Sequence, residues 1–295
     1  MKKFIILIPV YNDWQSVYKL LENIDLNIND RTEHFSVLMI NDSSTTMRPF
    51  NNTKFKNIYS IRIINMKTNK GHARCYAAGL RFITAKEDFD YVILMDGDGE
   101  DRPEELGLIL DKSSEYPLKT ITANRVKRSE GPLFRLLYQF HKFLTYVFTG
   151  KLIKFGNYSC IPKSAATKLV KNASVWSSFS GSVTKFISER TFVPSVRGRR
   201  YFGPSQMNLF NLLIHSFSII AVFKNLVVIR SFVFLALYFF LMFNNISVLT
   251  SVPILIILIF LFIIFKISLR ENINELNNSL NNIDSIDTLS NSNNR

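Results

Sequence analysis

The chain has 295 residues, a formal net charge of +13 and a composition that is 47% hydrophobic, with 26 Phe residues. That composition is ample for a large core, and the two cysteines, Cys75 and Cys160, give no metal-ligand spacing and fit a reducing compartment. The basic excess suits nucleic acid, anionic lipid or phosphorylated substrates. No nucleic-acid-binding motif accompanies it, so we expect no nucleic-acid partner.

The first 120 residues alternate short apolar runs with helical patterns. The run FIILIPV at 4–10 is typical of a parallel strand that is buried on both faces, and it is too short for a signal peptide. Alternation at this spacing predicts a doubly wound α/β sheet, in which ligands bind beyond the carboxyl ends of the strands. The expected strands are 4–10, 34–42, 58–66 and 91–96, and the expected helices are 13–24, 71–86 and 102–115.

Two later segments, 131–150 and 207–225, carry Leu, Phe and other apolar residues on most faces, with basic residues between them. They are too apolar for ordinary surface helices and too polar to span a bilayer, so both are candidates for amphipathic helices in the membrane interface. For 131–150, a core helix of the preceding domain is an equal alternative. We place that α/β domain at 1–206.

Residues 231–265 contain no ionisable group. One bilayer crossing takes about 20 apolar residues, so we predict a transmembrane hairpin over 227–266 that turns at Asn244 and Asn245, with Arg230 snorkelling to the interface. One spanning helix beside a buried or re-entrant segment is the alternative. Lys and Arg flank both ends of the hairpin, which by the positive-inside rule places the α/β domain at 1–206 and both termini in the cytoplasm. The polar tail, 267–295, is expected to form a short helix over 269–283 before becoming disordered.

The stretch YVILMDGDGEDRPEEL at 91–106 places four carboxylates directly after an apolar strand: Asp96, Asp98, Glu100 and Asp101. Clustered like charges cost free energy unless a cation or a solvated turn relieves the repulsion. Asp96 and Asp98 can converge on one Mg²⁺ or Mn²⁺, and Glu100 can add a direct or water-mediated ligand. The alternative is a solvated acidic turn that caps the following helix.

Four motifs stand in a fixed order along the chain: LIPVYND, VLMINDSS, NKGHARCYAAGL and MDGDGEDRPEEL. Together they resemble the family 2 glycosyltransferases of the nucleotide-sugar-binding GT-A fold, over residues 4–125. The resemblance implies that Asp96 and Asp98 are the catalytic carboxylates, because in that family the pair binds the divalent metal that bridges the donor diphosphate. It also implies a nucleotide-sugar site formed by Pro9, Tyr11, Asn12, Asp13, Asp42, Gly71 and Asp96.

The likeness is greater to the branch of dolichol-phosphate mannose synthases and bacterial polyprenyl-phosphate glycosyltransferases. The third metal contact of that branch would fall on Glu100. Two departures concern the acceptor end, because Asn157 stands where the branch often has Asp and Gln206 replaces a Lys. The phosphate-binding residues that the branch and the charge of the substrates imply are Arg125, Arg128, Arg135, Arg200 and Ser205.

The resemblance implies a membrane-bound, inverting glycosyltransferase that moves a sugar from a UDP- or GDP-sugar to a polyprenyl phosphate. A lipid phosphate is already ionised near neutral pH, so its attack needs no strong general base. The alternative is an enzyme that extends a lipid-linked saccharide or surface polysaccharide at a sugar hydroxyl, which would require one. Besides donor, acceptor and membrane lipids, a further copy of the chain is a possible partner. His72 is a weak catalytic candidate, and we expect it rather to pack or hydrogen-bond near the nucleotide.

Overall fold

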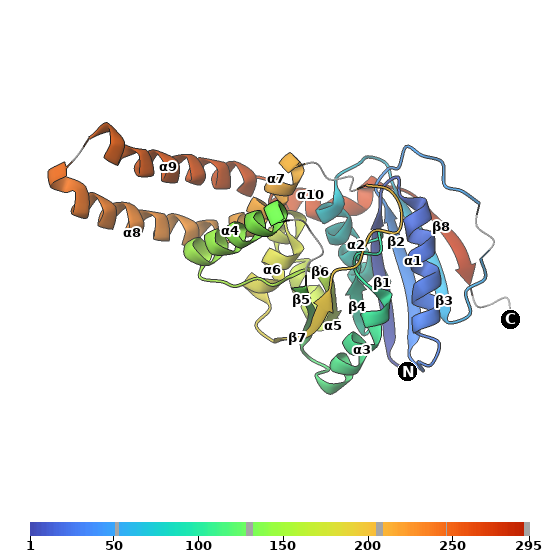
Figure 1. Cartoon of the computed structure of the whole chain (residues 1–295). Coiled ribbons are helices and arrows are strands. Elements are labelled where there is room, and N and C mark those ends of the chain that lie inside the picture. The colour runs from blue at the N-terminus through green and yellow to red at the C-terminus, as the bar shows by residue number, and fades with distance from the viewer. Residues whose placement is uncertain (51–52, 128–131, 205–208, 246, 292–295) are drawn as a thin grey trace.

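One mixed sheet forms the centre of the molecule in the computed structural model (Figure 1). The structure describes residues 1–50, 53–127, 132–204, 209–245 and 247–291. Within them, eight strands lie in the order β7-β5-β6-β4-β1-β2-β3-β8. Their bounds are Lys3–Val10 (β1), His34–Asn41 (β2), Ile58–Met66 (β3), Tyr91–Leu94 (β4), Thr120–Lys127 (β5), Phe155–Pro162 (β6), Arg190–Val196 (β7) and Ile283–Asn291 (β8).

The central strands are apolar on both faces because helices cover both. On one face of β1, Phe4, Ile6 and Ile8 pack in a core that also contains residues of α1 and α3. On the other face, Ile5 and Leu7 pack in a core with residues of α2, α5 and α6. These helices are Trp14–Asn27 (α1), His72–Lys86 (α2), Leu106–Glu115 (α3, preceded by a 3-10 turn at Pro103–Glu105), Lys163–Leu169 (α5) and Phe179–Phe186 (α6), with a 3-10 turn at Ala173–Trp176 before α6.

The direction of winding reverses at β1. The chain runs from β1 outward through β2 and β3, and then returns to place β4 on the other side of β1, with all four strands parallel. The doubly wound order predicted from the sequence is therefore confirmed for this half of the sheet. Strand β6 runs antiparallel to both β4 and β5, so the sheet as a whole is mixed.

Two apolar helices form a hairpin that projects away from the sheet (Figure 1). They are α8, Lys224–Met242, and α9, Val248–Ser268, and a 3-10 turn at Phe243–Asn245 follows α8 where the sequence predicted the turn. Both helices are long and apolar enough to cross a membrane. At the base of the hairpin, Phe148 of α4 (Pro132–Thr149) and Ile220 of α7 (Leu209–Ala221) pack in one cluster with Val227 and Ile264.

Arg230 contacts the carboxyl end of α4, and its expected position at the membrane interface stays a prediction. Its guanidinium donates hydrogen bonds to the carbonyl oxygens of Val147, at 2.8 Å, and Tyr146, at 3.4 Å. The last carbonyls of a helix lack intrahelical partners and carry partial negative charge, so a cation stabilises them. Arg230 therefore fastens α8 to α4.

Replacing Arg230 by alanine should destabilise the docking of α4 against the hairpin by about 1–3 kcal/mol, because its charge-assisted hydrogen bond to the carbonyl of Val147 is lost. The measurement is hydrogen–deuterium exchange of residues 146–150 in the full-length protein in detergent, where the variant should exchange faster. Lys151→Ala, which removes an exposed cation close by, serves as the control. Equal exchange in Arg230→Ala and wild type would contradict the capping role.

The prediction for the polar tail was wrong in its structure. In place of a helix over 269–283 and disorder after it, the tail forms α10 (Ile273–Asn277), a 3-10 turn at Ser279–Asn282, and β8. Strand β8 pairs antiparallel with β3, from Met66 opposite Ile283 to Ser60 opposite Asn291. An edge strand exposes unpaired N–H and C=O groups, and β8 satisfies those of β3. That pairing partner is more than 200 residues away in the chain, so local spacing in the tail gave no sign of it.

Candidate active site

The carboxyl ends of β1 and β4 are neighbours at the point where the winding reverses, and acidic residues follow both strands. Asp13 comes after β1, and Asp96 and Asp98 come after β4. In open α/β sheets this crevice is where ligands bind. The structure therefore brings together, at one edge of the sheet, carboxylates that are more than 80 residues apart in the sequence.

Asp96 is the most heavily hydrogen-bonded of these carboxylates. Its Oδ1 accepts hydrogen bonds from the hydroxyl of Tyr76, at 2.7 Å, and from Nδ2 of Asn157, at 3.2 Å. Nε2 of His72 lies 3.0 Å from the same oxygen. His72 and Tyr76 are four residues apart on α2, so they share the helix face that looks onto the carboxylate. These contacts fix the orientation of Asp96.

Asp98 faces a cation, Arg200, which also bridges to Asp13. The guanidinium places Nη1 2.6 Å from Oδ2 of Asp98 and Nη2 2.6 Å from Oδ2 of Asp13. Arg200 is only 16% exposed, and the carboxylates it joins follow different strands. Asp13 directly precedes α1, but its side chain makes no capping bond to that helix. Arg200 thus links the loops that follow β1 and β4.

Residues 197–201 lie across the acidic turn and bind its backbone. The N–H of Gly198 donates to the carbonyl of Glu100, at 2.8 Å, and the N–H of Tyr201 donates to that of Asp98, at 2.9 Å. The Glu100 carboxylate is ion-paired with Arg197. Gly99 adopts φ +87° beneath the ring of Tyr201, where any Cβ would collide with the ring, so both the backbone angle and the space require glycine.

The other residues expected at the nucleotide-sugar site lie along the same edge of the sheet. Asp42 is buried and its two carboxylate oxygens accept the N–H groups of Lys70 and Gly71, each at 2.8 Å. Asn12 adopts φ +54°, and its Oδ1 accepts the backbone N–H groups of residues 45 and 46. Pro9 is buried within β1, whereas Tyr11 is 42% exposed. Asp42 therefore holds the backbone of the loop after β3, and Asn12 holds that of the loop after β2.

Of the five residues expected to bind phosphate, the structure places Arg125 and Arg200 beside the acidic cluster. Arg125 lies at the end of β5 with Nη2 3.9 Å from Oδ1 of the buried Asp101. Arg128 and Ser205 lie outside the described residues, and Arg135 lies in α4, where its side chain is not described. The phosphate roles of all five remain predictions.

Burial and mutual repulsion act differently on the clustered carboxyl groups. Burial and the charges of Asp96 and Glu100 raise the pKa of Asp98 to about 6. Burial and the charge of Asp96 also raise the pKa of Asp101 to about 8, although Arg125 opposes the shift. Burial tends to raise the pKa of Asp96, but the charge and hydrogen bond of His72 outweigh it and lower that pKa. Asp96 is therefore the carboxylate that stays ionised.

The pair Asp96 and Asp98 fits a hard divalent cation, because both present carboxylate oxygens on one turn and Mg²⁺ and Mn²⁺ prefer one or two carboxylates together with substrate phosphates. The carboxylate of Glu100 is paired with Arg197, as that of Asp98 is paired with Arg200, so the role of Glu100 as a third ligand stays a prediction. Among the described residues, no group of three or more His, Cys, Asp or Glu side chains is arranged to hold a metal. The geometry therefore supports a site with two carboxylates that the substrate completes.

Metal binding at this site should weaken as the pH falls through about 6, because protons compete with the cation for Asp98, whose pKa is raised to about 6. Below that pH, the affinity for Mn²⁺ should fall by up to about tenfold per pH unit, since one proton is taken up. Titration of Mn²⁺ into the full-length protein, followed by electron paramagnetic resonance at pH 5, 6, 7 and 8, measures this. An affinity that is constant over the range would contradict the role of Asp98.

Sequence reasoning missed two residues of the site and understated a third. Tyr76 was taken only as part of a helix, although its spacing of four from His72 could have revealed their common face. Arg197 precedes Arg200 in the basic run RGRR, and only the path of the chain over the acidic turn explains its contact with Glu100. Asn157 was noted as a departure from the pattern, whereas in the structure it contacts Asp96.

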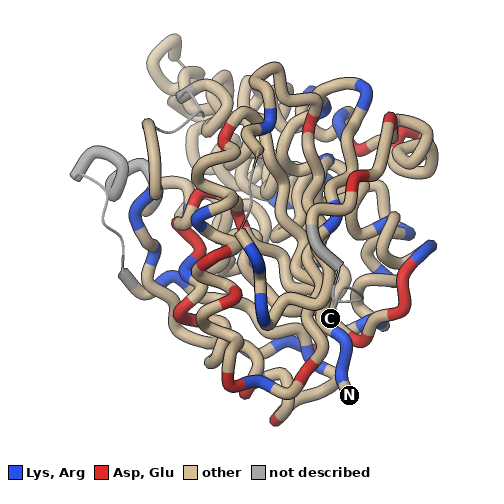
Figure 2. The backbone as a smooth tube through the Cα atoms, turned by 90° about the vertical axis from the view of Figure 1, so that its right-hand side faces the viewer, with Lys and Arg blue, Asp and Glu red and all other residues tan. Residues whose placement is uncertain are grey.

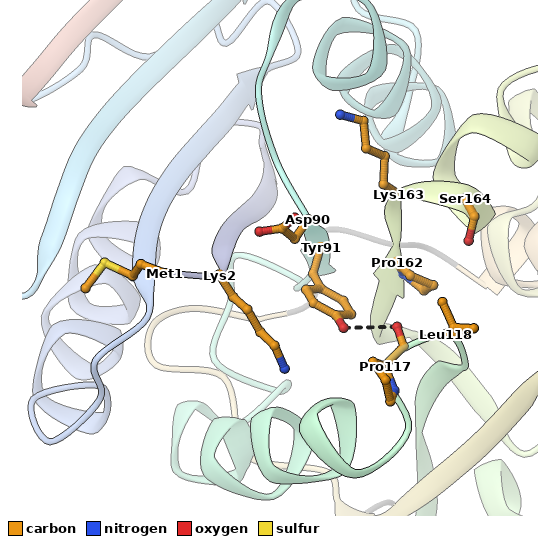
Figure 3. Close-up of a pocket in the computed structure, with 9 residues that line it drawn as sticks. All are labelled: Met1, Lys2, Asp90, Tyr91, Pro117, Leu118, Pro162, Lys163 and Ser164. Carbon is orange, nitrogen blue, oxygen red and sulfur yellow. Dashed lines mark hydrogen bonds between the residues drawn. The ribbon is translucent and has the colours of Figure 1, made fainter.

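A cavity of about 460 Å³ lies at the opposite edge of the sheet, near the amino ends of β1 and β4 (Figure 3). It is lined by residues such as Lys2 and Asp90, and the hydroxyl of Tyr91 donates to the carbonyl of Pro117 beside it. None of the clustered carboxylates lines it. Figure 2 shows basic and acidic residues interspersed over the molecule. Charge distribution and cavity size thus do not locate the site, whereas strand topology does.

Comparison with solved structures establishes the fold. The structure matches mannosyl-3-phosphoglycerate synthase from Rubrobacter xylanophilus with a TM-score of 0.55 at 12% identity, covering 75% of this chain and 72% of the other. It matches glucosyl-3-phosphoglycerate synthase from Mycobacterium tuberculosis, in complex with Mn²⁺, UDP-glucose and phosphoglyceric acid, with a TM-score of 0.52 at 12% identity, covering 77% and 80%. These proteins have the GT-A fold, and this chain shares it.

Curated relatives include undecaprenyl-phosphate 4-deoxy-4-formamido-L-arabinose transferases. The protein from Erwinia tasmaniensis is 22% identical over 219 residues, and that from Klebsiella pneumoniae strain 342 is 25% identical over 228 residues. Each match covers 72% of this chain but only 65% and 66% of the relatives, less than two thirds of their length. The family description "Glycosyl transferase family 2" matches residues 5–177, more than half of the sequence. The chain therefore belongs to glycosyl transferase family 2.

Proposed function

We propose that this protein is a membrane-bound, inverting glycosyltransferase that moves a sugar from a nucleotide-sugar donor to a polyprenyl phosphate. The observation that carries the proposal is the pair Asp96 and Asp98 at the carboxyl edge of the sheet, where the winding reverses. The fold neighbour from Mycobacterium tuberculosis binds Mn²⁺ and UDP-glucose, which supports a nucleotide-sugar donor and a divalent metal. We propose a UDP- or GDP-sugar as the donor and Mg²⁺ or Mn²⁺ as the metal.

Asp96 and Asp98 would hold the divalent ion, whose positive charge stabilises the departing nucleoside diphosphate. His72, Tyr76 and Asn157 keep Asp96 oriented by the contacts described above. Arg200 and Arg125 supply further positive charge for phosphate groups, and the planar guanidinium of Arg200 can contact two oxygens at once. An ionised lipid phosphate attacks the anomeric carbon from the side opposite the leaving group, so a single displacement inverts that centre.

The acceptor is assigned from the relatives and from the apolar helices. The curated relatives are named as transferases acting with undecaprenyl phosphate. The aromatic side chains of Phe140, Phe143 and Tyr146 on α4 are more than half exposed beside the hairpin base. Aromatic side chains on an amphipathic helix suit the membrane interface, so we place α4 and α7 there. The hairpin then spans the bilayer with the catalytic domain and both termini in the cytoplasm.

Transfer to a sugar hydroxyl of a lipid-linked saccharide or surface polysaccharide is the second candidate. It would require a general base near the attacking oxygen. The raised pKa of Asp101, about 8, is the observation that favours it, because the ionised form of a carboxyl group of that pKa is a stronger base than an ordinary carboxylate. Asp101 is only 4% exposed and its Oδ2 accepts the N–H of Asp96, which makes direct contact with an acceptor difficult. The lipid phosphate is therefore preferred.

The test uses membranes that contain the full-length protein, a panel of radiolabelled UDP- and GDP-sugars, and undecaprenyl phosphate, with and without Mg²⁺ or Mn²⁺. We expect metal-dependent release of nucleoside diphosphate and a labelled lipid product that mild acid cleaves. An acid-stable product would favour the saccharide acceptor. If no donor released a nucleoside diphosphate in the presence of metal, the protein would be a membrane-anchored nucleotide-binding scaffold and the proposal would be wrong.

A further inference from the structure

The C-terminal segment from Asn278 to the end of β8 holds the loop that follows β3. The backbone N–H of Lys67 donates to the carbonyl of Asn282, at 2.7 Å. The side chains of Thr68 and Asn282 are joined at 2.9 Å, and Nδ2 of Asn282 donates to the carbonyl of Thr68, at 3.1 Å. Two residues further on, the N–H groups of Lys70 and Gly71 bind Asp42. The tail thus fixes a loop that reaches the candidate site.

A second set of contacts starts from Asp287 in β8 and runs inward along the edge of the sheet. Oδ2 of Asp287 accepts a hydrogen bond from Nδ2 of Asn65, at 3.2 Å, and Oδ1 of Asn65 accepts one from Nδ2 of Asn41, at 2.9 Å. Oδ1 of Asn41 accepts the N–H of Ser44, at 3.0 Å, and Oγ of Ser44 accepts the N–H of Asn12, also at 3.0 Å. This polar chain ends next to Asp13, which Arg200 links to Asp98.

The tail determines which way the Asn65 amide points. Its Nδ2 has two acceptors in β8, the hydroxyl of Ser285 at 2.9 Å and the carboxylate of Asp287. With the NH₂ group held on that side, Oδ1 faces Asn41 and accepts its hydrogen bond. If the Asn65 amide were reversed, its NH₂ group would face the NH₂ group of Asn41. Neither can accept a hydrogen bond from the other, so the series of hydrogen bonds would be interrupted there.

The same carboxylate also anchors the loop between Asp42 and residue 50. Nη1 of Arg48 lies 2.8 Å from Oδ2 of Asp287. From the other side, α1 holds the loop, because Nε1 of Trp14 donates to the carbonyl of Thr46 and the hydroxyl of Tyr18 donates to that of Pro49, each at 3.3 Å. The loop after β2 is therefore fixed between α1 and the C-terminal strand.

We propose that Asp287 is a positioning residue for the nucleoside end of the donor, acting through Arg48 and through the polar chain from Asn65 to Asn12. The inference rests on the proposed function in that the loops after β1 and β2 receive the nucleoside, while the diphosphate lies at Asp96 and Asp98. It assigns a role in donor binding to the polar tail beyond the membrane hairpin. The strand does not touch the reacting atoms.

The test compares full-length wild type, Asp287→Ala, Arg48→Ala and the control Asp284→Ala, which removes an exposed carboxylate from the same strand. The first measurement is hydrogen–deuterium exchange of peptides that cover 11–14 and 43–50, without ligand. The second is the KM and kcat for whichever UDP- or GDP-sugar the wild type uses, in the presence of Mn²⁺. Thermal unfolding of each variant is recorded as well.

We expect Asp287→Ala and Arg48→Ala to exchange faster at 43–50, and Asp287→Ala also at 11–14. The KM for the donor should rise about tenfold, the effect of losing one partly exposed charge-assisted hydrogen bond, with kcat changed less than twofold. Asp287→Asn, which keeps an acceptor for Asn65, should recover part of the change. Exchange and KM equal to those of Asp284→Ala would overturn the inference, as would a fall in kcat at constant KM. If the wild type turned over no donor, the proposed function would fail, and unchanged exchange at 43–50 would still separately refute the positioning role.

Discussion

Replacing Asp98 by alanine is expected to lower the rate of sugar transfer by about a thousandfold, or roughly 4 kcal/mol of transition-state stabilisation. The loss has a direct physical cause, because Asp96 and Asp98 together would hold the cation. A single remaining carboxylate would bind it too weakly for the cation to hold the diphosphate as well. The variant should remain folded and membrane-bound, because burial and neighbouring charges already disfavour the ionised form of Asp98.

Release of nucleoside diphosphate from the donor and binding of Mn²⁺, followed by electron paramagnetic resonance, are the measurements. Asp111→Ala is the matched control, since Asp111 is an exposed carboxylate on α3 that pairs with Arg31. Both activity and Mn²⁺ affinity should fall in Asp98→Ala and persist in the control. Turnover within tenfold of the wild type would remove the metal assignment.

Replacing Arg200 by alanine should lower transfer by about a hundredfold, or roughly 3 kcal/mol, without weakening the binding of Mn²⁺. The two effects separate because Arg200 competes with a cation for the carboxylate of Asp98, yet supplies positive charge to phosphate when substrate is present. Arg200→Lys should recover little of the activity, because an ammonium group cannot contact Asp98 and Asp13 with the forked geometry of the guanidinium.

The control for Arg200 is Arg199→Ala, which removes an exposed arginine of the same charge from the neighbouring position. Steady-state kinetics with donor and acceptor varied separately, together with Mn²⁺ titration, distinguish the two roles of Arg200. Acceptor kinetics that are unchanged in Arg200→Ala would contradict its phosphate role. A tenfold loss of Mn²⁺ affinity would show instead that Arg200 supports the metal site.

The parallel half of the sheet could be predicted from the sequence because its signals are local. The run from Phe4 to Val10 is apolar at every position, and the strand at Ile58–Met66 has the predicted bounds. The edge strand β8 could not be predicted in this way, since most of its residues are polar and their pairing partner lies far away in the sequence. The contacts of Arg230 could not be predicted from local spacing either, because its partners are carbonyl groups of a different helix.

The candidate site was predictable in its residue types but not in its pairings. Asp96 and Asp98 stand out as clustered carboxylates after a buried strand, and the motifs around them indicated their chemistry. The bridge from Arg200 to Asp13, and the pairing of Arg197 with Glu100, depend on how residues 197–201 cross the acidic turn. No periodicity in the sequence encodes that path. The sequence thus identified the acidic turn, and the structure identified the arginines that neutralise its negative charge.

The position of β8 in the chain has a consequence for biosynthesis. This strand follows α8 and α9 in sequence, yet it completes the sheet that begins at Lys3. A ribosome delivers the chain from its amino end, so both apolar helices emerge before the edge of β3 can be closed. The sheet is therefore completed only after both apolar helices have been synthesised, so closure of its edge is a late step in the folding of the nascent protein.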